Sequence, residues 1–89
     1  MRAVVTVFGK DKVGIIAEVS AMLAENNVNI LDVSQTLMAE NFTMMMMVEL
    51  NEAEADFAAL KHKLEDLGKR TGLSIRIQRE DIFQEMHQL

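Results

Sequence analysis

The sequence predicts an α+β fold in a single domain, with helices covering one face of a β-sheet. Four short segments hold alternating or continuous apolar residues, a pattern that is typical of strands. Two longer segments place apolar residues three and four positions apart, which is typical of amphipathic helices. The chain has 89 residues, of which 49% are hydrophobic. This length leaves room for one domain with a modest core.

A strand followed by a helix is predicted at the start of the chain. Residues 3–8 are mostly β-branched or aromatic, and the run stops at Gly9. We expect a helix to follow, with Asp11 as its N-cap and Asn26 and Asn27 as a left-handed stop. Its apolar residues recur at helical spacing and are Ile15, Ile16, Val19, Met22 and Leu23.

A hairpin is predicted next, formed by strands over residues 28–38 and 42–50 around a short polar break. In the first of these strands the apolar positions change parity between Ile30 and Leu31. A β-bulge near Leu31 or Asp32 would explain that change, because a bulge inserts one extra residue into a strand.

The rest of the chain predicts a second helix, a fourth strand and a short third helix. Asn51 stands three residues before Glu54, as in a capping box, and Gly68 is the expected C-terminal cap of the second helix. Residues 73–78 alternate as a strand, and residues 80–89 resume a helical pattern. The resulting order is β-α-β-β-α-β plus a helix, the ferredoxin-like arrangement, in one domain over residues 1–89.

Right-handed crossovers place both long helices on one face of a four-stranded antiparallel sheet and leave the other face open. Alternation along the third strand sends Met45 and Met47 to that open face. The apolar stripe of residues 80–89 also has no evident cover. We therefore predict a homodimer or a higher homo-oligomer.

Composition excludes several classes of function. The chain has no cysteine, so it forms no disulfide, thiolate metal site or cysteine nucleophile. A net charge of -5, with Phe as the only aromatic residue, argues against nucleic acid as a partner. The first residues lack the apolar region of a signal peptide, and no apolar run approaches the roughly 20 residues that span a bilayer. We expect a cytoplasmic protein that has no membrane contact and needs no cofactor.

The loop between the first strand and the first helix is the candidate ligand site. Its backbone N–H groups stand at a helix start and favour an anion such as a carboxylate. Gly14 removes a side chain where a ligand or a neighbouring backbone can approach closely. Lys10 and Lys12 flank the site. The spacing alone favours a simpler interpretation, a capped helix packed tightly on a strand, and both interpretations stay open.

The segments D-K-V-G-I-I and N-N-V-N-I-L-D-V-S-Q resemble the signature of the ACT-domain family, and the order of elements agrees over the whole chain. The similarity extends to small stand-alone ACT proteins related to the glycine-cleavage repressor. This resemblance implies a regulatory site for an amino acid or a similar metabolite near a subunit interface. The residues it implies are Asp11, Lys12, Val13, Gly14, Ile15 and Asn29. Asp11 replaces the Asn of several effector-binding members, and its carboxylate would repel a ligand carboxylate while attracting an ammonium group.

No catalytic or metal-binding residues are predicted. Met44 to Met47 are consecutive, so a strand sends them to opposite faces and they cannot converge on a metal ion. His62 and His87 lie on the polar sides of helical patterns with no nucleophile beside them. Acylphosphatase shares the order of elements, but its loop needs an arginine that residues 9–14 lack. A purely structural or protein-interaction module remains as the alternative to a metabolite-binding domain.

Overall fold

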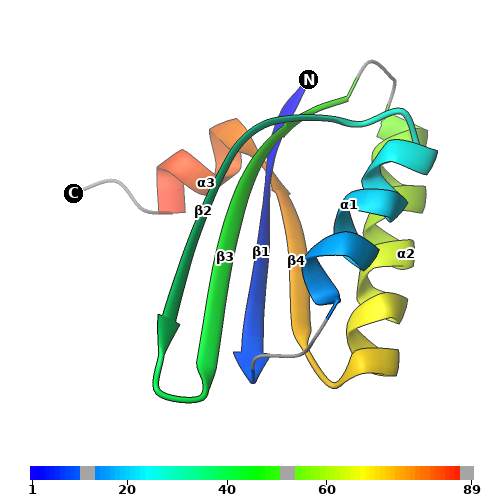
Figure 1. Ribbon diagram of the computed structural model, residues 1–89. Coiled ribbons are helices and arrows are strands. Elements are labelled where there is room, and N and C mark those ends of the chain that lie inside the picture. Colours follow the sequence, from blue (N-terminus) through cyan, green and yellow to red (C-terminus); the bar gives the residue numbers. More distant parts are fainter. Residues whose placement is uncertain (11–13, 51–53, 87–89) are drawn as a thin grey trace.

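The computed structural model describes residues 1–10, 14–50 and 54–86, except for the side chains of 54–56 and 84–86 (Figure 1). Its elements are β1 (Arg2–Lys10), α1 (Ile15–Glu25), β2 (Asn29–Met38), β3 (Asn41–Glu49), α2 (Glu54–Thr71), β4 (Ser74–Arg79) and α3 (Glu80–Met86). This order confirms the predicted ferredoxin-like fold with its additional C-terminal helix.

The four strands form one antiparallel sheet in the order β2-β3-β1-β4. The parallel strands β1 and β2 are therefore separated by β3, as the right-handed crossover predicts. β1 and β3 pair without interruption from Arg2 with Glu49 to Lys10 with Asn41. The register of β2 against β3 shifts between Ile30 and Asp32, which confirms the bulge expected there.

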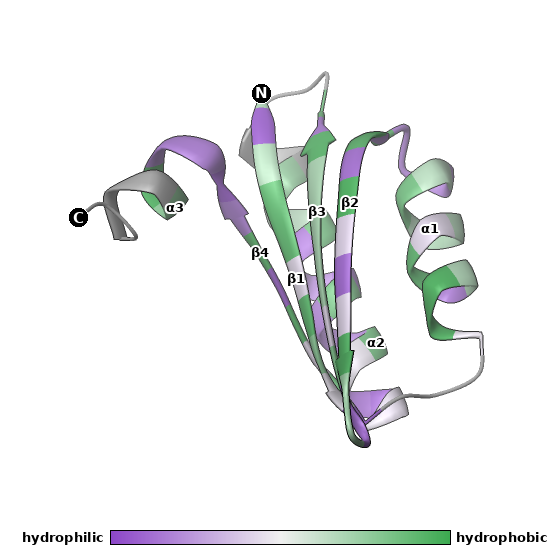
Figure 2. Ribbon diagram, turned by 60° about the vertical axis from the view of Figure 1, so that its left-hand side comes forward, coloured by the Kyte–Doolittle hydropathy of each residue, from purple (hydrophilic) through white to green (hydrophobic). Residues whose placement is uncertain are grey.

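α1 and α2 cover one face of the sheet, and the main core lies between them and the strands (Figures 1 and 2). Alternation along β3 divides the methionine run between the two faces, as expected. Met44 and Met46 are fully buried in this core. Met45 is 38% exposed and Met47 is partly buried on the opposite face, which we call the open face. The methionine run is thus half core and half surface.

α3 lies on the open face of the sheet, across from α1 and α2 (Figure 2). Its Phe83 is partly buried and lies beside Val4, which is only 4% exposed. The expectation that nothing in the domain covers the C-terminal stripe is therefore wrong for Phe83, although Ile82 does remain exposed. Sequence periodicity identifies the apolar side of a helix, but it does not show which part of the domain that side contacts. The contact between Phe83 and Val4 could therefore not be predicted.

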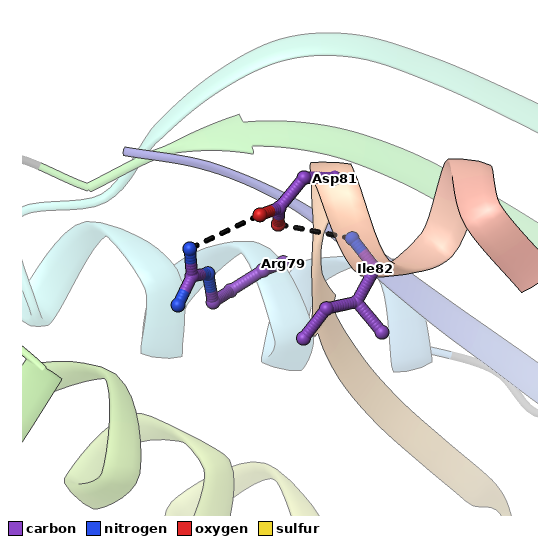
Figure 3. Close-up of polar contacts among 3 residues, drawn as sticks. All are labelled: Arg79, Asp81 and Ile82. Atoms are coloured by element: carbon purple, nitrogen blue, oxygen red, sulfur yellow. Dashed lines mark hydrogen bonds and ion pairs between the residues drawn. The ribbon is translucent and has the colours of Figure 1, made fainter.

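Polar contacts hold the turn from β4 into α3 (Figure 3). Asp81 accepts a hydrogen bond from the backbone N–H of Ile82 at 2.9 Å, and its carboxylate lies 3.1 Å from the guanidinium of Arg79. Arg2 of β1 and Glu80 form a looser ion pair at 4.0 Å. Exposed pairs of this kind stabilise a fold only weakly, so they orient α3 more than they anchor it.

Two helix ends differ from the sequence prediction. The N-cap of α1 is Gly14, in a left-handed conformation with φ of 84° and no side-chain cap, whereas Asp11 was expected to cap it and lies outside the described residues. The second helix continues past Gly68 to Thr71, and Gly72, with φ of 76°, follows its end. The predicted cap at Asn51 also lies outside the described residues. The left-handed stop at Asn27 is confirmed, with φ of 59°.

Gly68 is instead a contact residue inside α2. A Cβ atom at this position would lie 2.7 Å from the carbonyl oxygen of Leu73, and the amide N–H of Leu73 donates a 2.9 Å hydrogen bond to the carbonyl of Gly68. The absence of a side chain lets the chain turn from α2 into β4 against the helix. A glycine in mid-helix looks like a stop in the sequence, because a packing requirement of this kind is not visible there.

We predict that Gly68→Ala destabilises the protein by about 1 to 3 kcal/mol, because the added methyl group meets backbone that cannot move easily. Helix propensity alone predicts the opposite sign, since Ala stabilises a helix interior by roughly 0.5 to 1 kcal/mol relative to Gly. Urea denaturation measures the difference. Ala59→Gly, at an exposed position of α2, calibrates the propensity effect. A more stable Gly68→Ala variant would contradict the close-packing account.

Candidate functional site

The start of α1 is an exposed helix N-terminus. The hydrogen bond from Glu18 N–H to Gly14 C=O, at 3.0 Å, belongs to the first turn, in which the earlier N–H groups have no intrahelical acceptor. Gly14 is exposed, and nothing lies within 4 Å of the position that its Cβ would occupy. Ile15 is 3% exposed and belongs to the core, so its side chain anchors the helix. Asp11, Lys12 and Val13 lie outside the described residues.

Asn29 does not lie beside the start of α1 in the same chain. It is exposed at the first position of β2 and pairs with Glu49. The helix α1 runs from the end of the sheet where β1 stops toward the end where β2 begins (Figure 1). Its 11 residues rise by about 16 Å, so Gly14 and Asn29 stand at opposite ends of this helix. One chain therefore does not bring Gly14 and Asn29 together.

β2 is an edge strand with an unusual amount of exposed apolar surface. It pairs only with β3, and every one of its residues except Ile30 is exposed. Val33 and Leu37 point to the helix-covered side but are 42% and 60% exposed, because α1 leaves this edge largely uncovered. Long apolar edges are normally protected by charge or by a partner strand. The sequence pattern alone missed this surface, because it does not show which strand lies at the edge.

The open face holds a cavity of about 190 Å³ between the sheet and α3. The cavity has a mostly apolar lining that includes the two open-face methionines predicted from alternation. Its lining residues are Val4, Asp32, Ser34, Met45, Met46, Met47 and Phe83. Among these, Phe83 was not expected, because its position depends on the turn into α3.

No metal-binding constellation is found among the described residues. No three His, Cys, Asp or Glu side chains in this part of the chain are grouped to hold a metal ion. His62 is exposed, and its nearest acidic partner is Glu65 on the same helix at 3.8 Å. His87 lies outside the described residues. No described helix is long and apolar enough to cross a membrane.

Comparison with known proteins agrees with this geometry. The family model described as ACT domain matches residues 2–78. A UPF0237 protein of Methanocaldococcus jannaschii is 50% identical over 99% of this chain and 98% of its own length. A UPF0237 protein of Clostridium acetobutylicum is 52% identical over the full length of both chains. This chain therefore belongs to the ACT-domain family, and within it to the small UPF0237 proteins.

Solved structures extend the comparison to the fold. An ACT domain protein from Streptococcus pneumoniae has a TM-score of 0.82 and 45% identity, with 94% of each chain covered. A putative glycine cleavage system transcriptional repressor has a TM-score of 0.75 at 23% identity and matches 86% of this chain but only 44% of its own. The regulatory subunit of aspartate kinase from Thermus thermophilus has a TM-score of 0.64 at 23% identity, over 86% of this chain and 50% of that one. The last two likenesses concern the fold alone.

We predict that Gly14 tolerates Asn much better than Val when no ligand is present. Asn adopts left-handed backbone more readily than other non-glycine residues, whereas a β-branched residue at φ of 84° is strained. Thermal denaturation should show a loss of stability of less than about 1 kcal/mol for Gly14→Asn and of roughly 1 to 3 kcal/mol for Gly14→Val. Equal losses for the two variants would contradict the left-handed conformation.

Proposed function

We propose that this protein is a non-enzymatic regulatory ACT domain that binds a small metabolite, such as an amino acid, at a boundary between two copies of the chain. The observation that carries the proposal is the separation of Gly14 from Asn29 within one chain, together with the exposed β2 edge beside α1. A site that needs both groups takes one from each copy.

A twofold axis through the middle of β2 satisfies this requirement. Antiparallel pairing of β2 with β2 of a second copy continues the sheet and joins the two edges. It places the first residue of one β2 near the last residue of the other. Because the beginning of β2 and the beginning of α1 lie at opposite ends of the sheet, Asn29 of one copy moves toward the α1 start of its partner (Figure 1). The same pairing covers Val33 and Leu37.

The chemistry of the two groups suits an amino acid. N–H groups at a helix start favour a carboxylate, and Asp11 offers a carboxylate for an ammonium group. Asn29 has an amide that both donates and accepts hydrogen bonds. These groups orient a ligand and include no nucleophile with a base. The regulatory subunit and the putative repressor among the structural neighbours are named for regulation, which supports a sensing role.

A thermal-shift screen of the twenty amino acids and common metabolites tests for binding. A ligand at a hundred times its dissociation constant adds about 2.7 kcal/mol of stability. For a domain of this size the midpoint should rise by roughly 10 to 20 °C. A complete screen without any shift would instead favour the structural or protein-interaction module.

Once a ligand is found, calorimetry on Asn29→Ala and Gly14→Asn locates the site. We expect Asn29→Ala to weaken binding about fivefold, the equivalent of one hydrogen bond worth about 1 kcal/mol. Gly14→Asn should weaken it at least as much, because a side chain then occupies the approach to the helix start. His62→Ala removes an exposed polar side chain from α2, away from the β2 boundary, and should bind normally. Unchanged affinity in both test variants would place the site elsewhere.

We also expect no acylphosphatase or other hydrolase activity, because residues 9–14 include no arginine to hold a phosphate. An assay with an acyl phosphate checks this. Turnover that persists through purification and disappears on changing Lys10 or Lys12 would contradict the prediction.

A further inference from the structure

The open face carries an exposed aromatic side chain as well as the cavity. Phe8 is 53% exposed and lies on this face with Val4 and Thr6, because Ala3, Val5 and Val7 alternate into the core. It pairs with Thr43 on β3 and Ser74 on β4, so only small side chains flank it. The cavity lies four residues earlier along β1, around Val4.

We propose that two copies of this chain pack open face against open face, with Phe8 of each copy inserted into the cavity beside Val4 of the other. This contact goes beyond the proposed β2 boundary and uses a different surface. Four observations support a second copy as the occupant of the cavity.

The first observation is size. A phenyl ring fits an apolar cavity of about 150 Å³, and this one measures about 190 Å³. Metabolite pockets are usually larger, at roughly 300 to 1,000 Å³. The cavity is therefore better matched to one aromatic side chain than to a whole ligand.

The second observation is register. Thr6 pairs with Met45 on β3, and Met45 pairs with Ser34 on β2, so these residues form one row across the open face. Consider a twofold axis that runs along this row and lies between the two copies, parallel to both sheets. It places each residue on one side of the row opposite the residue at the same distance on the other side in the second copy. Phe8 and Val4 lie at equal distances on either side of Thr6. Phe8 of one copy then stands opposite Val4 of the other, with sheets about 10 Å apart.

The third observation is shape. α3 projects from the open face beside the first half of β1, and no helix among the described residues lies over the other end of this face (Figure 2). An axis parallel to the strands would bring the two α3 helices against each other at the same end. The axis across the strands places each α3 over the uncovered end of its partner. In this arrangement the projecting α3 of each copy packs against the part of the partner's open face that carries no described helix.

The fourth observation is charge. Lys10 is exposed two residues beyond Phe8, and Glu80 and Asp81 stand at the start of α3 at the opposite end of the face. The proposed axis places Lys10 of one copy opposite Arg2 of the other, which pairs with Glu80 and lies beside Glu49. Acidic side chains outnumber the cations there, because Glu49, Glu80 and Asp81 surround Arg2 and Arg79. The proposed axis also brings the two Arg76 side chains together at the exposed β4 rim, where water and salt screen their repulsion.

Sedimentation equilibrium on Phe8→Thr and Met45→Arg tests the contact from both sides. Phe8→Thr removes the inserted ring at an exposed position, and Met45→Arg places a charged side chain in the cavity lining on β3, away from the β2 boundary. We expect each change to raise the dissociation constant of this contact at least tenfold and to halve the assembly mass at micromolar concentration. Leu37→Thr removes an exposed apolar side chain from the other face of the sheet, at the proposed β2 boundary. It can weaken only that boundary, so the contact between Phe8 and Met47 described below should survive it. Wild-type mass in folded Phe8→Thr and Met45→Arg would overturn the proposal.

An NMR experiment makes the test independent of mass. Phe8 pairs with Thr43, and Met47 lies four residues further along β3, so the two side chains are about 13 Å apart within one chain. In a sample that mixes isotope-labelled and unlabelled chains, we expect a nuclear Overhauser contact between the Phe8 ring and the Met47 methyl group of different copies. Its absence in an assembled sample overturns the proposed axis. Ligand binding at the β2 boundary is measured separately, so either interface can fail without the other.

Discussion

The uninterrupted pairing of β1 with β3 is the contact on which the rest of the structure depends. Nine residue pairs join these central strands, and β2 and β4 attach to their outer edges. Because side chains alternate along paired strands, this register decides which residues enter the core and which form the open face. A slip of one residue would expose Met44 and Met46 and bury Met45 and Met47. The core and both proposed contact surfaces would then be lost together.

Much of the fold is predictable from the sequence because local patterns carry it. The alternation of Met44 to Met47, the change of parity at Ile30 and the left-handed Asn27 each follow from one short segment. The errors concern relations between segments. Gly68 looks like a helix stop, but it is required by the return of the chain at Leu73. The burial of Val4 likewise depends on the position of α3, whose Phe83 lies beside it.

The candidate site likewise has one part that the sequence predicts and another part that only the folded chain shows. Gly14 at a helix start is recognisable from the sequence, and its left-handed conformation agrees with the choice of glycine. The relation of Gly14 to Asn29 is a property of the folded chain, because α1 separates them by its whole length. The exposed apolar edge of β2 is also invisible until the strand order is known. These two features indicate that a site near a subunit interface, as the sequence predicts, would take its two halves from different copies.

The central claim is that each ligand site takes its helix start from one copy and Asn29 from another, and mixing two defective variants tests it most directly. Gly14→Asn and Asn29→Ala are first shown to bind weakly alone and are then unfolded together and refolded. Half of randomly paired dimers are mixed, and each mixed dimer regains one intact site, so about a quarter of all sites should bind with wild-type affinity. A site formed within one chain would regain none. Calorimetry that finds no tight sites in a mixture shown to contain mixed dimers would contradict the account.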